Sequence, residues 1–340
     1  MPAERKPEAG GFNLNLKNTE QKKRLAGAEI EWMLDQSAKC TVQLACDSEW
    51  LGKLSPRDFQ ESLTVDWKGS CIFQGHLTGY RQSDSNRLTL IYEDQLSLFK
   101  KTYDHSFIKS NSLSSVLEAV AGLGKTSADL QGDFGGSVPS FSLEGRSLYE
   151  NLTDLGARFG FFFTADQKGE RIQMIRAGNH VGNKTIDLSV EPHQTQIEVS
   201  NEHLYEKLNV KFFDSKNLEA TEKEFGQSQL YSKIHTFQEH SGYSAKTSWK
   251  SSKTSHGIHA SDSDHFEGLE GVIPFQLSKL ALQQEVLKLS CFVPGITPGQ
   301  ILNLESPIAG NILAGKFFVL GCHYQFLSAI PKVTVIGVRA

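Results

Sequence analysis

The sequence predicts a mainly β protein that is interrupted by a small α+β segment. Phenylalanine supplies 21 of the 340 residues and aromatic residues reach 10%, a composition that suits pleated sheets. Short runs of alternating apolar and polar residues recur near the N-terminus and again after residue 184, whereas helical periodicity is strongest between these regions. A chain of this length can form two domains, or two domains with an insertion.

The first β-rich region is predicted to span residues 12–105, after a flexible N-terminus at residues 1–11 that combines Pro, Gly and mixed charge. Alternation of apolar and polar residues indicates strands at 40–45, 63–67 and 86–93. The sequence DWKG at 66–69 is typical of a turn, and it leads directly into a further strand at Ser70. Strands this short and this closely spaced favour a small antiparallel barrel or sandwich.

An α+β insertion is predicted over residues 106–183. Its first helix has one apolar face, made of Leu113, Val116, Leu117 and Val120. Ser112 is a suitable N-cap for this helix, and Gly122 is a suitable stop.

The second helix of the insertion begins after Ser147, which forms a capping-box pattern with Glu150, and it ends at Gly160. Its buried stripe consists of Leu148, Leu152, Leu155 and Phe159. A hairpin follows at once, with strands at 161–164 and 171–175 joined by a turn at 166–169.

The second β-rich region is predicted over residues 184–340. Alternation indicates antiparallel strands at 207–213, 316–324 and 332–339, the last two forming a long hairpin. Residues 239–265 are rich in Ser, His and Lys, which is typical of a long polar loop or an exposed hairpin. Helical spacing predicts one helix within 276–289, with Leu277, Leu280, Ala281 and Leu287 on its apolar face.

Composition argues against several classes of function. A net charge of −4 and a pI near 6.3 give no indication of nucleic-acid recognition. No apolar run approaches the roughly 20 residues that cross a bilayer, so we expect no membrane insertion by the chain itself. The N-terminus lacks the apolar core of a signal peptide, so we expect export only as part of a larger particle.

The cysteines favour buried reduced thiols over disulfides or a zinc site. Their number is odd and no two are spaced C-x-x-C. They are Cys40, Cys46, Cys71, Cys291 and Cys322.

Residues 119–126 (AVAGLGKT) have the form of a nucleotide-binding P-loop with Ala in place of the first Gly. That mechanism needs a strand before the glycines and a helix after them, carrying Lys125 and Thr126 at its start. The predicted order is reversed, because a helix precedes Gly124. We therefore interpret the glycines as a helix stop.

A metal site could be sought in the polar stretch that holds His256, His259, Asp262, Asp264 and His265. The spacing of the first two histidines fits neither an i, i+4 helical pair nor the H-E-x-x-H pattern. A solvated polar loop is therefore the favoured interpretation.

Catalytic patterns are also weak. The carboxylate pairs Asp214/Glu219 and Glu222/Glu224 lie in polar segments, whereas glycosidase chemistry needs one carboxyl in an apolar pocket. His323, beside Cys322 on an apolar strand, is better explained as a core or rim histidine. The sequence predicts no catalytic, cofactor-binding or metal-binding residues.

Five segments, together with the closing hairpin that holds His323, resemble the baseplate hub family of contractile injection systems. This family includes the late-control protein D group of phage tails, the hub of large contractile phages and the N-terminal part of type VI secretion VgrG spikes. Residues 144–163 (EGRSLYENLTDLGARFGFFF) are the most specific, and they are similar to a family helix that is followed by a strand pair. The other segments are 73–79 (FQGHLTG), 88–96 (LTLIYEDQL), 107–117 (FIKSNSLSSVL) and 294–304 (PGITPGQILNL). The resemblance spans about residues 70–340.

The resemblance implies two related antiparallel β-barrels joined by the small helical and hairpin domain. It also implies a homotrimer, arranged as a pseudo-hexameric ring, that adapts a hexameric tail tube to a trimeric spike. VgrG-type proteins continue into a spike, and this chain stops before one, so the resemblance implies a separate spike protein. The expected partners are tail-tube protein, spike and other baseplate proteins, and the expected location is a tail or injection particle assembled in the bacterial cytoplasm.

Two other classes of function stay open at this point. One is a β-rich ligand- or receptor-binding module of a tail particle without enzymatic activity. The other is an enzyme, either a nucleotide hydrolase that uses Lys125 or a wall-degrading hydrolase. Absence of a catalytic constellation in the sequence favours the non-enzymatic classes, and we expect the chain not to be an enzyme.

Overall fold

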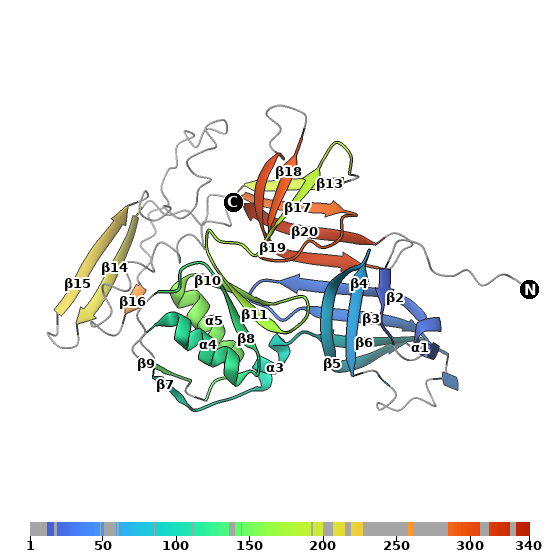
Figure 1. Ribbon diagram of the computed structural model, residues 1–340, viewed down its shortest axis with the longest axis horizontal. Coiled ribbons are helices and arrows are strands. Elements are labelled where there is room, and N and C mark those ends of the chain that lie inside the picture. The colour runs from blue at the N-terminus through green and yellow to red at the C-terminus, as the bar shows by residue number, and fades with distance from the viewer. Residues whose placement is uncertain are drawn as a thin grey trace, which may run out of the picture.

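The computed structural model of the chain is built mainly from β-strands, with its helices gathered in one region (Figure 1). It describes residues 12–16, 19–47, 49–50, 59, 61–84, 86–109, 112–135, 140–143, 145–191, 193–199, 207–214, 219–226, 258–260, 285–306, 313–326 and 331–340. The prediction of a mainly β fold with an α+β insertion is confirmed.

The first lobe is a curled antiparallel sheet in the order β1-β4-β5-β6-β3-β2. Register shifts between Leu77 and Gly79 and between Val65 and Asp66 add twist, because a bulge bends the strand that carries it. A short helix, α1 (Thr19–Lys23), precedes β2. The strands are β1 (Phe12–Leu14), β2 (Leu25–Met33), β3 (Lys39–Ala45), β4 (Ser62–Trp67), β5 (Ser70–Asp84) and β6 (Arg87–Glu93).

The second lobe continues the same sheet. Its long strand β19 pairs with β2 through residues 321–325, so both lobes belong to one twelve-stranded sheet. Outward from this pairing, six antiparallel strands lie on the first-lobe side, β2-β3-β6-β5-β4-β1, and four on the other side, β19-β20-β17-β13. Strand β18 pairs with the start of β19, and β12 pairs in parallel with β18. These strands are β12 (Asn183–Asp187), β13 (His193–Val199), β17 (Glu285–Cys291), β18 (Ile301–Glu305), β19 (Gly315–Gln325) and β20 (Lys332–Arg339).

The insertion lies between the lobes in sequence and beside the first lobe in space (Figure 1). Its three-stranded sheet, β10-β11-β8, packs against two helices, and β8 runs parallel to β11. A short ribbon of β7 and β9 lies at its margin. The helices are α3 (Leu96–Lys101), α4 (Leu113–Leu123) and α5 (Leu148–Phe159), and the strands are β7 (Phe107–Lys109), β8 (Ser127–Gln131), β9 (Ser140–Ser142), β10 (Phe161–Ala165) and β11 (Arg171–Arg176).

Both long helices end as the sequence predicts, with one shift. In α4, Ser112 accepts a hydrogen bond from the Ser115 N–H, but the helix runs past Gly122 and is capped by Gly124. In α5, Ser147 and Glu150 form the capping box, and Gly160 ends the helix in the left-handed conformation.

Two separate apolar cores stabilise the fold. One fills both lobes of the large sheet and includes Trp67, Tyr92 and Tyr324, each fully or almost fully buried. The other fills the insertion, where the face of α4 meets that of α5. Helix α3 precedes residue 106, yet its Leu96 and Phe99 pack in this second core. The insertion core therefore includes residues from the end of the first β-rich region.

The helix predicted within 276–289 is wrong at its C-terminal end. Residues 285–291 form strand β17, which pairs with β13 on one side and with β20 on the other. Leu287 and Leu289 are buried and Lys288 between them is exposed, so the local period is two. Residues 276–284 lie outside the described residues.

The strands predicted at 207–213, 316–324 and 332–339 are confirmed as β14, β19 and β20. β14 (Lys207–Asp214) pairs with β15 (Glu219–Gly226) and with β16 (Ile258–Ala260) in a separate small sheet. Figure 1 shows this sheet at the end of the molecule away from the first lobe. Apart from β16, the polar stretch 239–265 lies outside the described residues, as does the N-terminus 1–11.

Candidate functional site

The turn between β2 and β3, residues 34–38, meets the insertion on one side and the end of β6 on the other. It is held by two aspartates, Asp35 within the turn and Asp94 just after β6. Asp35 has a φ of 60°, a left-handed conformation that Asp tolerates better than most side chains. We call this set of contacts the Asp35–Asp94 junction.

Asp35 fastens the turn to the insertion. Its backbone N–H donates to the carbonyl of Phe163 at 2.8 Å, and its Oδ1 accepts from the Phe163 N–H at 2.9 Å. The hydroxyl of Tyr149, on α5, donates to the Asp35 carbonyl at 2.6 Å. One residue of the turn therefore contacts both a strand and a helix of the insertion.

Asp94 fastens the other side of the turn. Its Oδ1 accepts from the Ser37 hydroxyl at 2.7 Å and from the Leu96 N–H at 3.1 Å, and its Oδ2 accepts from the Ala38 N–H at 2.9 Å. The carboxyl is buried, and burial raises the pKa of Asp94 to about 6, although its hydrogen bonds act in the opposite direction. Asp94 thus links the turn to the start of α3.

A histidine extends this polar cluster toward β5. Ser97 on α3 donates to the Asp94 carbonyl at 2.9 Å, and its hydroxyl lies 2.8 Å from Nε2 of His76. Burial lowers the pKa of His76, and Lys101 lowers it further. The imidazole is therefore favoured in its neutral form.

Apolar contacts close the junction. Leu34, Phe162 and Phe318 belong to a small cluster that joins the turn, the insertion and the last hairpin, with the two Phe rings 5.6 Å apart. The Leu34 N–H donates to the Leu320 carbonyl at 2.9 Å, and the indole N–H of Trp32 donates to Thr164 at 2.7 Å. The junction therefore fixes how the insertion sits on both lobes.

We expect Asp35→Ala to lower the free energy of unfolding by about 2 kcal/mol. The variant loses an acceptor for a backbone N–H and places Ala in a left-handed conformation. Asp35→Asn is the matched control, because it keeps Oδ1 and tolerates the same φ, and it should lose less than about half as much. Urea denaturation measures both, and amide exchange at Phe163 should accelerate in the Ala variant. Equal losses in the two variants would contradict this role.

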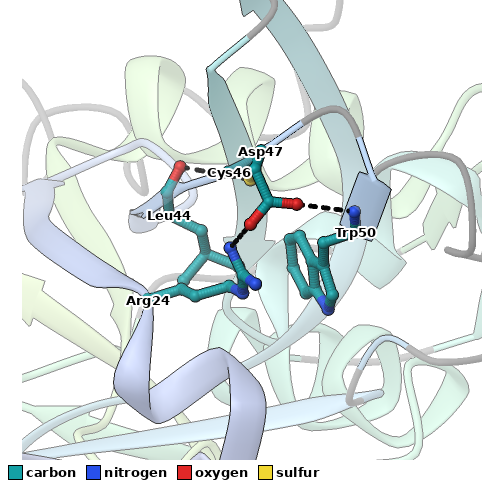
Figure 2. A network of polar contacts seen from close by, with 5 residues as sticks. All are labelled: Arg24, Leu44, Cys46, Asp47 and Trp50. Atoms are coloured by element: carbon teal, nitrogen blue, oxygen red, sulfur yellow. Dashed lines mark hydrogen bonds and ion pairs between the residues drawn. The ribbon is translucent and has the colours of Figure 1, made fainter.

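A second polar network lies where β3 ends (Figure 2). Asp47 accepts from Arg24 through Oδ2 at 2.8 Å and from the Trp50 N–H through Oδ1 at 2.7 Å, and the Arg24 guanidinium lies 4.8 Å from the Trp50 ring centre. Cys46 donates to the Leu44 carbonyl at 3.5 Å, and burial raises the pKa of its thiol. The Asp47 side chain is 57% exposed, so this pair adds little stability and mainly orients the chain that leaves β3.

The P-loop-like segment is a helix end, as the sequence predicts. Gly124 caps α4, with its N–H donating to the Val120 carbonyl at 3.3 Å. Lys125 has a φ of 57°, and the Thr126 hydroxyl donates to the Glu170 carbonyl at 2.6 Å. The helix precedes the glycines and strand β8 follows them, the reverse of a phosphate-binding loop.

The described residues include no group of three or more His, Cys, Asp or Glu that could hold a metal. Of the polar-stretch candidates, His259 lies in β16, and His256, Asp262, Asp264 and His265 lie outside the described residues. Backbone register places Asp214 opposite Glu219 at one end of the β14–β15 pair, and Glu222 and Glu224 opposite Lys211 and Asn209.

His323 and the cysteines occupy structural positions. His323 Nε2 lies 3.7 Å from a carboxylate oxygen of Glu29, and its side chain is 36% exposed, as expected of a rim histidine. All five cysteines are free, and Cys71 alone among them is not fully buried. Burial raises the pKa of the Cys40 and Cys322 thiols far above the ordinary value, which makes them poor nucleophiles.

Sequence patterns did not reveal the junction. Asp35 and Asp94 each look like ordinary turn residues, because Asp is common in turns. Their partners Phe163, Ser37 and Ala38 are identified by tertiary contact, and a single sequence carries no sign of these pairs.

No described helix has the length and apolar character needed to cross a membrane.

The two-lobed sheet with a helical insertion is a fold of phage tail proteins. A tail protein from Neisseria meningitidis MC58 aligns over 97% of this chain and 96% of its own, with a TM-score of 0.67 and 12% identity. The 43 kDa tail protein of prophage MuSo2 from Shewanella oneidensis aligns over 93% and 94%, with a TM-score of 0.63 and 12% identity.

A type VI secretion component from E. coli, c3393, has a similar fold. It aligns over 96% of this chain and 77% of its own, with a TM-score of 0.59 and 11% identity, and it is described as structurally similar to the T4 tail proteins gp27 and gp5. No protein-family model matches the chain, and no curated protein matches it in sequence. At these identities the comparisons establish the fold.

Proposed function

We propose that this chain is the structural hub of a contractile tail or injection machine and that it is not an enzyme. Three copies would form a pseudo-hexameric ring, with each copy supplying two β-rich lobes. Such a ring would adapt a hexameric tail tube to a trimeric spike. Closed symmetry of this kind satisfies repeated surfaces without open-ended growth.

The observation that carries the proposal is the shared fold. Two tail proteins match this chain over more than nine-tenths of both lengths, so lobes and insertion are common to all three. Antiparallel strands extend from the β2–β19 pairing into both lobes, which supports two β-rich contributions per copy to a ring. The Asp35–Asp94 junction would keep the insertion in one orientation, which an adaptor under mechanical force needs.

The proposed partners follow from this role. They are two further copies of the chain, a tail-tube protein, a separate spike protein and other baseplate proteins. The proposed location is a particle that is assembled in the bacterial cytoplasm and then acts as part of a tail or injection machine.

We expect the purified chain to have a solution mass of about 113 kDa, three times the 37.7 kDa of one chain. Multi-angle light scattering across a range of protein concentrations measures this mass. A dissociating trimer should shift toward 37.7 kDa on dilution, because subunit association depends on concentration.

A strict monomer calls for the same measurement with the neighbouring spike protein added. A trimer formed on the spike would support the hub. A chain that stays monomeric in both measurements would contradict the hub and favour a β-rich ligand- or receptor-binding module of the particle.

A further inference from the structure

The ribbon at the margin of the insertion has one edge without a partner in the part of the chain that is described. Strand β7 pairs with β9 alone, and the ladder extends beyond both strands. The Leu143 N–H donates to the Ser106 carbonyl and the Gly145 N–H donates to the Asp104 carbonyl, in the same register as the β7–β9 pairs. Segment 104–109 is therefore extended, and Figure 1 shows it at the rim of the molecule.

The backbone of this segment presents hydrogen-bonding groups outward. In an antiparallel ladder, residues alternate between pointing both backbone groups at the partner and pointing both away. The backbone carbonyls of Asp104 and Ser106 point toward the β9 side, because they accept ladder bonds from it. Ile108 has the same parity along the strand, so its backbone groups point the same way. His105 and Phe107 consequently direct their N–H and C=O groups to the open edge. Open strand edges are templates for another strand.

The side chains on one face of this edge are exposed and largely aromatic. Tyr103 is 62% exposed and Phe107 is 57% exposed, while Ile108 on the other face packs against the insertion core. Alternation places Tyr103, His105, Phe107 and Lys109 on the same face, and all four are exposed. The two aromatic rings are about 13 Å apart along the strand, the span of four residues. We call these four residues the aromatic edge.

The charge of the aromatic edge favours an acidic partner over a second copy. It carries Lys109 and His105 and no acidic side chain. Antiparallel self-pairing centred on Phe107 would place each Lys109 opposite a His105 and not opposite a carboxylate, since the neighbouring Asp104 carboxylate accepts from the Ser106 N–H. A strand with acidic residues beside its apolar ones would pair with this lysine and would also cover the rings.

We propose that the aromatic edge binds an extended segment of another protein by strand addition to β7. The bound segment would carry apolar side chains at alternate positions to cover Tyr103 and Phe107, and acidic residues to pair with Lys109. Backbone hydrogen bonds to His105 and Phe107 would set its register, and the aromatic rings would set its specificity. Strand addition at this edge would not require the ring arrangement proposed above.

The test uses the full chain and three labelled synthetic peptides, with binding followed by fluorescence anisotropy. The acidic peptide ETVTVTVTE, whose Glu and Val side chains share one face, should bind at least tenfold more tightly than its basic counterpart KTVTVTVTK. The interrupted peptide ETVTPTVTE should not bind, because its proline removes a backbone donor that faces β7. No saturable binding of any peptide would overturn the proposal.

Two variants locate the binding. Phe107→Pro removes an outward N–H and leaves the β7–β9 ladder bonds in place, and Tyr103→Ser with Phe107→Ser removes the rings without altering the backbone. Each should weaken binding of the acidic peptide at least tenfold, whereas Val190→Ser, at an apolar residue that is 73% exposed elsewhere, should not change it. Unchanged binding in the double Ser variant would overturn the proposal, as would a dimer of the wild-type chain that Phe107→Pro dissociates.

Discussion

Trp67→Ala should lower the free energy of unfolding by about 3–5 kcal/mol, the largest loss that we expect from a single substitution in the core. Trp67 ends β4 in the first lobe and is 1% exposed. Its ring meets Tyr324 and Phe326, from the last hairpin, edge-on at 5.9 Å and 6.0 Å. Phe12 stacks on Phe326 at 3.9 Å, so one aromatic cluster joins the first strand, β4 and the last hairpin.

Deletion of this indole would open a cavity between the lobes. The surrounding strands are fixed by ladder bonds and can collapse only partly, which is why we place the loss at the upper end of large-to-small substitutions. The cluster spans both lobes, so the loss should appear in a single transition, with an unchanged dependence on urea. Far-UV circular dichroism during urea denaturation measures it.

Trp67→Phe is the control that tells whether stability is lost with side-chain volume or with a hydrogen bond. The indole N–H of Trp67 has no hydrogen-bond partner among the described residues, so Phe removes volume without breaking a bond. We expect its loss to be less than about half of that of the Ala variant. A loss below about 1 kcal/mol for Trp67→Ala would show that the lobes are held together mainly by the β2–β19 pairing.

Helix caps, turns and alternating strands could be predicted from the sequence, because each depends on residues that are close together in the chain. The caps of α4 and α5, the turn at 166–169 and the alternation of β20 each depend on residues within a few positions of one another. Asp166 illustrates this, because its Oδ1 accepts from the Glu170 N–H within the same turn at 2.7 Å. These elements form as predicted, except that α4 is capped by Gly124 and not by Gly122.

Long-range pairing could not be predicted in the same way. Residues 276–289 carried apolar residues at helical spacing, but the part that became β17 lies between β13 and β20, and two ladders outweigh a weak helical pattern. The parallel pairs β8–β11 and β12–β18 also lack any local signal. Register between distant strands depends on which faces become buried, and this is decided by the whole fold.

The junction shows the same limit for the candidate site. Trp32 and Thr164 are 132 positions apart and share a buried hydrogen bond of 2.7 Å. The resemblance to baseplate hubs implied an insertion that joins two barrels, but it did not identify these residues. Their roles follow only from the contacts.

Stability should depend on pH through Asp94, with a change of about 3 kcal/mol. The ordinary pKa of its carboxyl is 3.8, and burial raises the pKa of Asp94 to about 6 in the folded chain. Between these pH values the folded state holds more protons than the unfolded state, so the contribution of Asp94 to stability falls as pH rises. A shift of about two pH units corresponds to about 3 kcal/mol.

Other carboxyls act in the opposite direction. Hydrogen bonds lower the pKa of Asp104, Glu150 and Asp187, so these groups add stability as pH rises in the acid range. The useful quantity is therefore the difference in free energy of unfolding between the wild-type chain and Asp94→Asn, measured by urea denaturation at each pH. This difference cancels the other carboxyls. It should fall by about 3 kcal/mol in total between about pH 3 and about pH 7, most steeply between pH 3.8 and pH 6, and stay constant above pH 7.

Ser37→Ala tests how burial and hydrogen bonding each contribute to the pKa of Asp94. The Ser37 hydroxyl donates to the Asp94 carboxylate and lowers its pKa, so removal of this hydroxyl should raise the pKa further and extend the fall in stability to higher pH. A difference curve that is flat or that rises between pH 4 and pH 6.5 would mean that the three donors outweigh burial. In that case the carboxylate would be the preferred form at the junction throughout this range, and charge-assisted hydrogen bonds would hold the turn at each of these pH values.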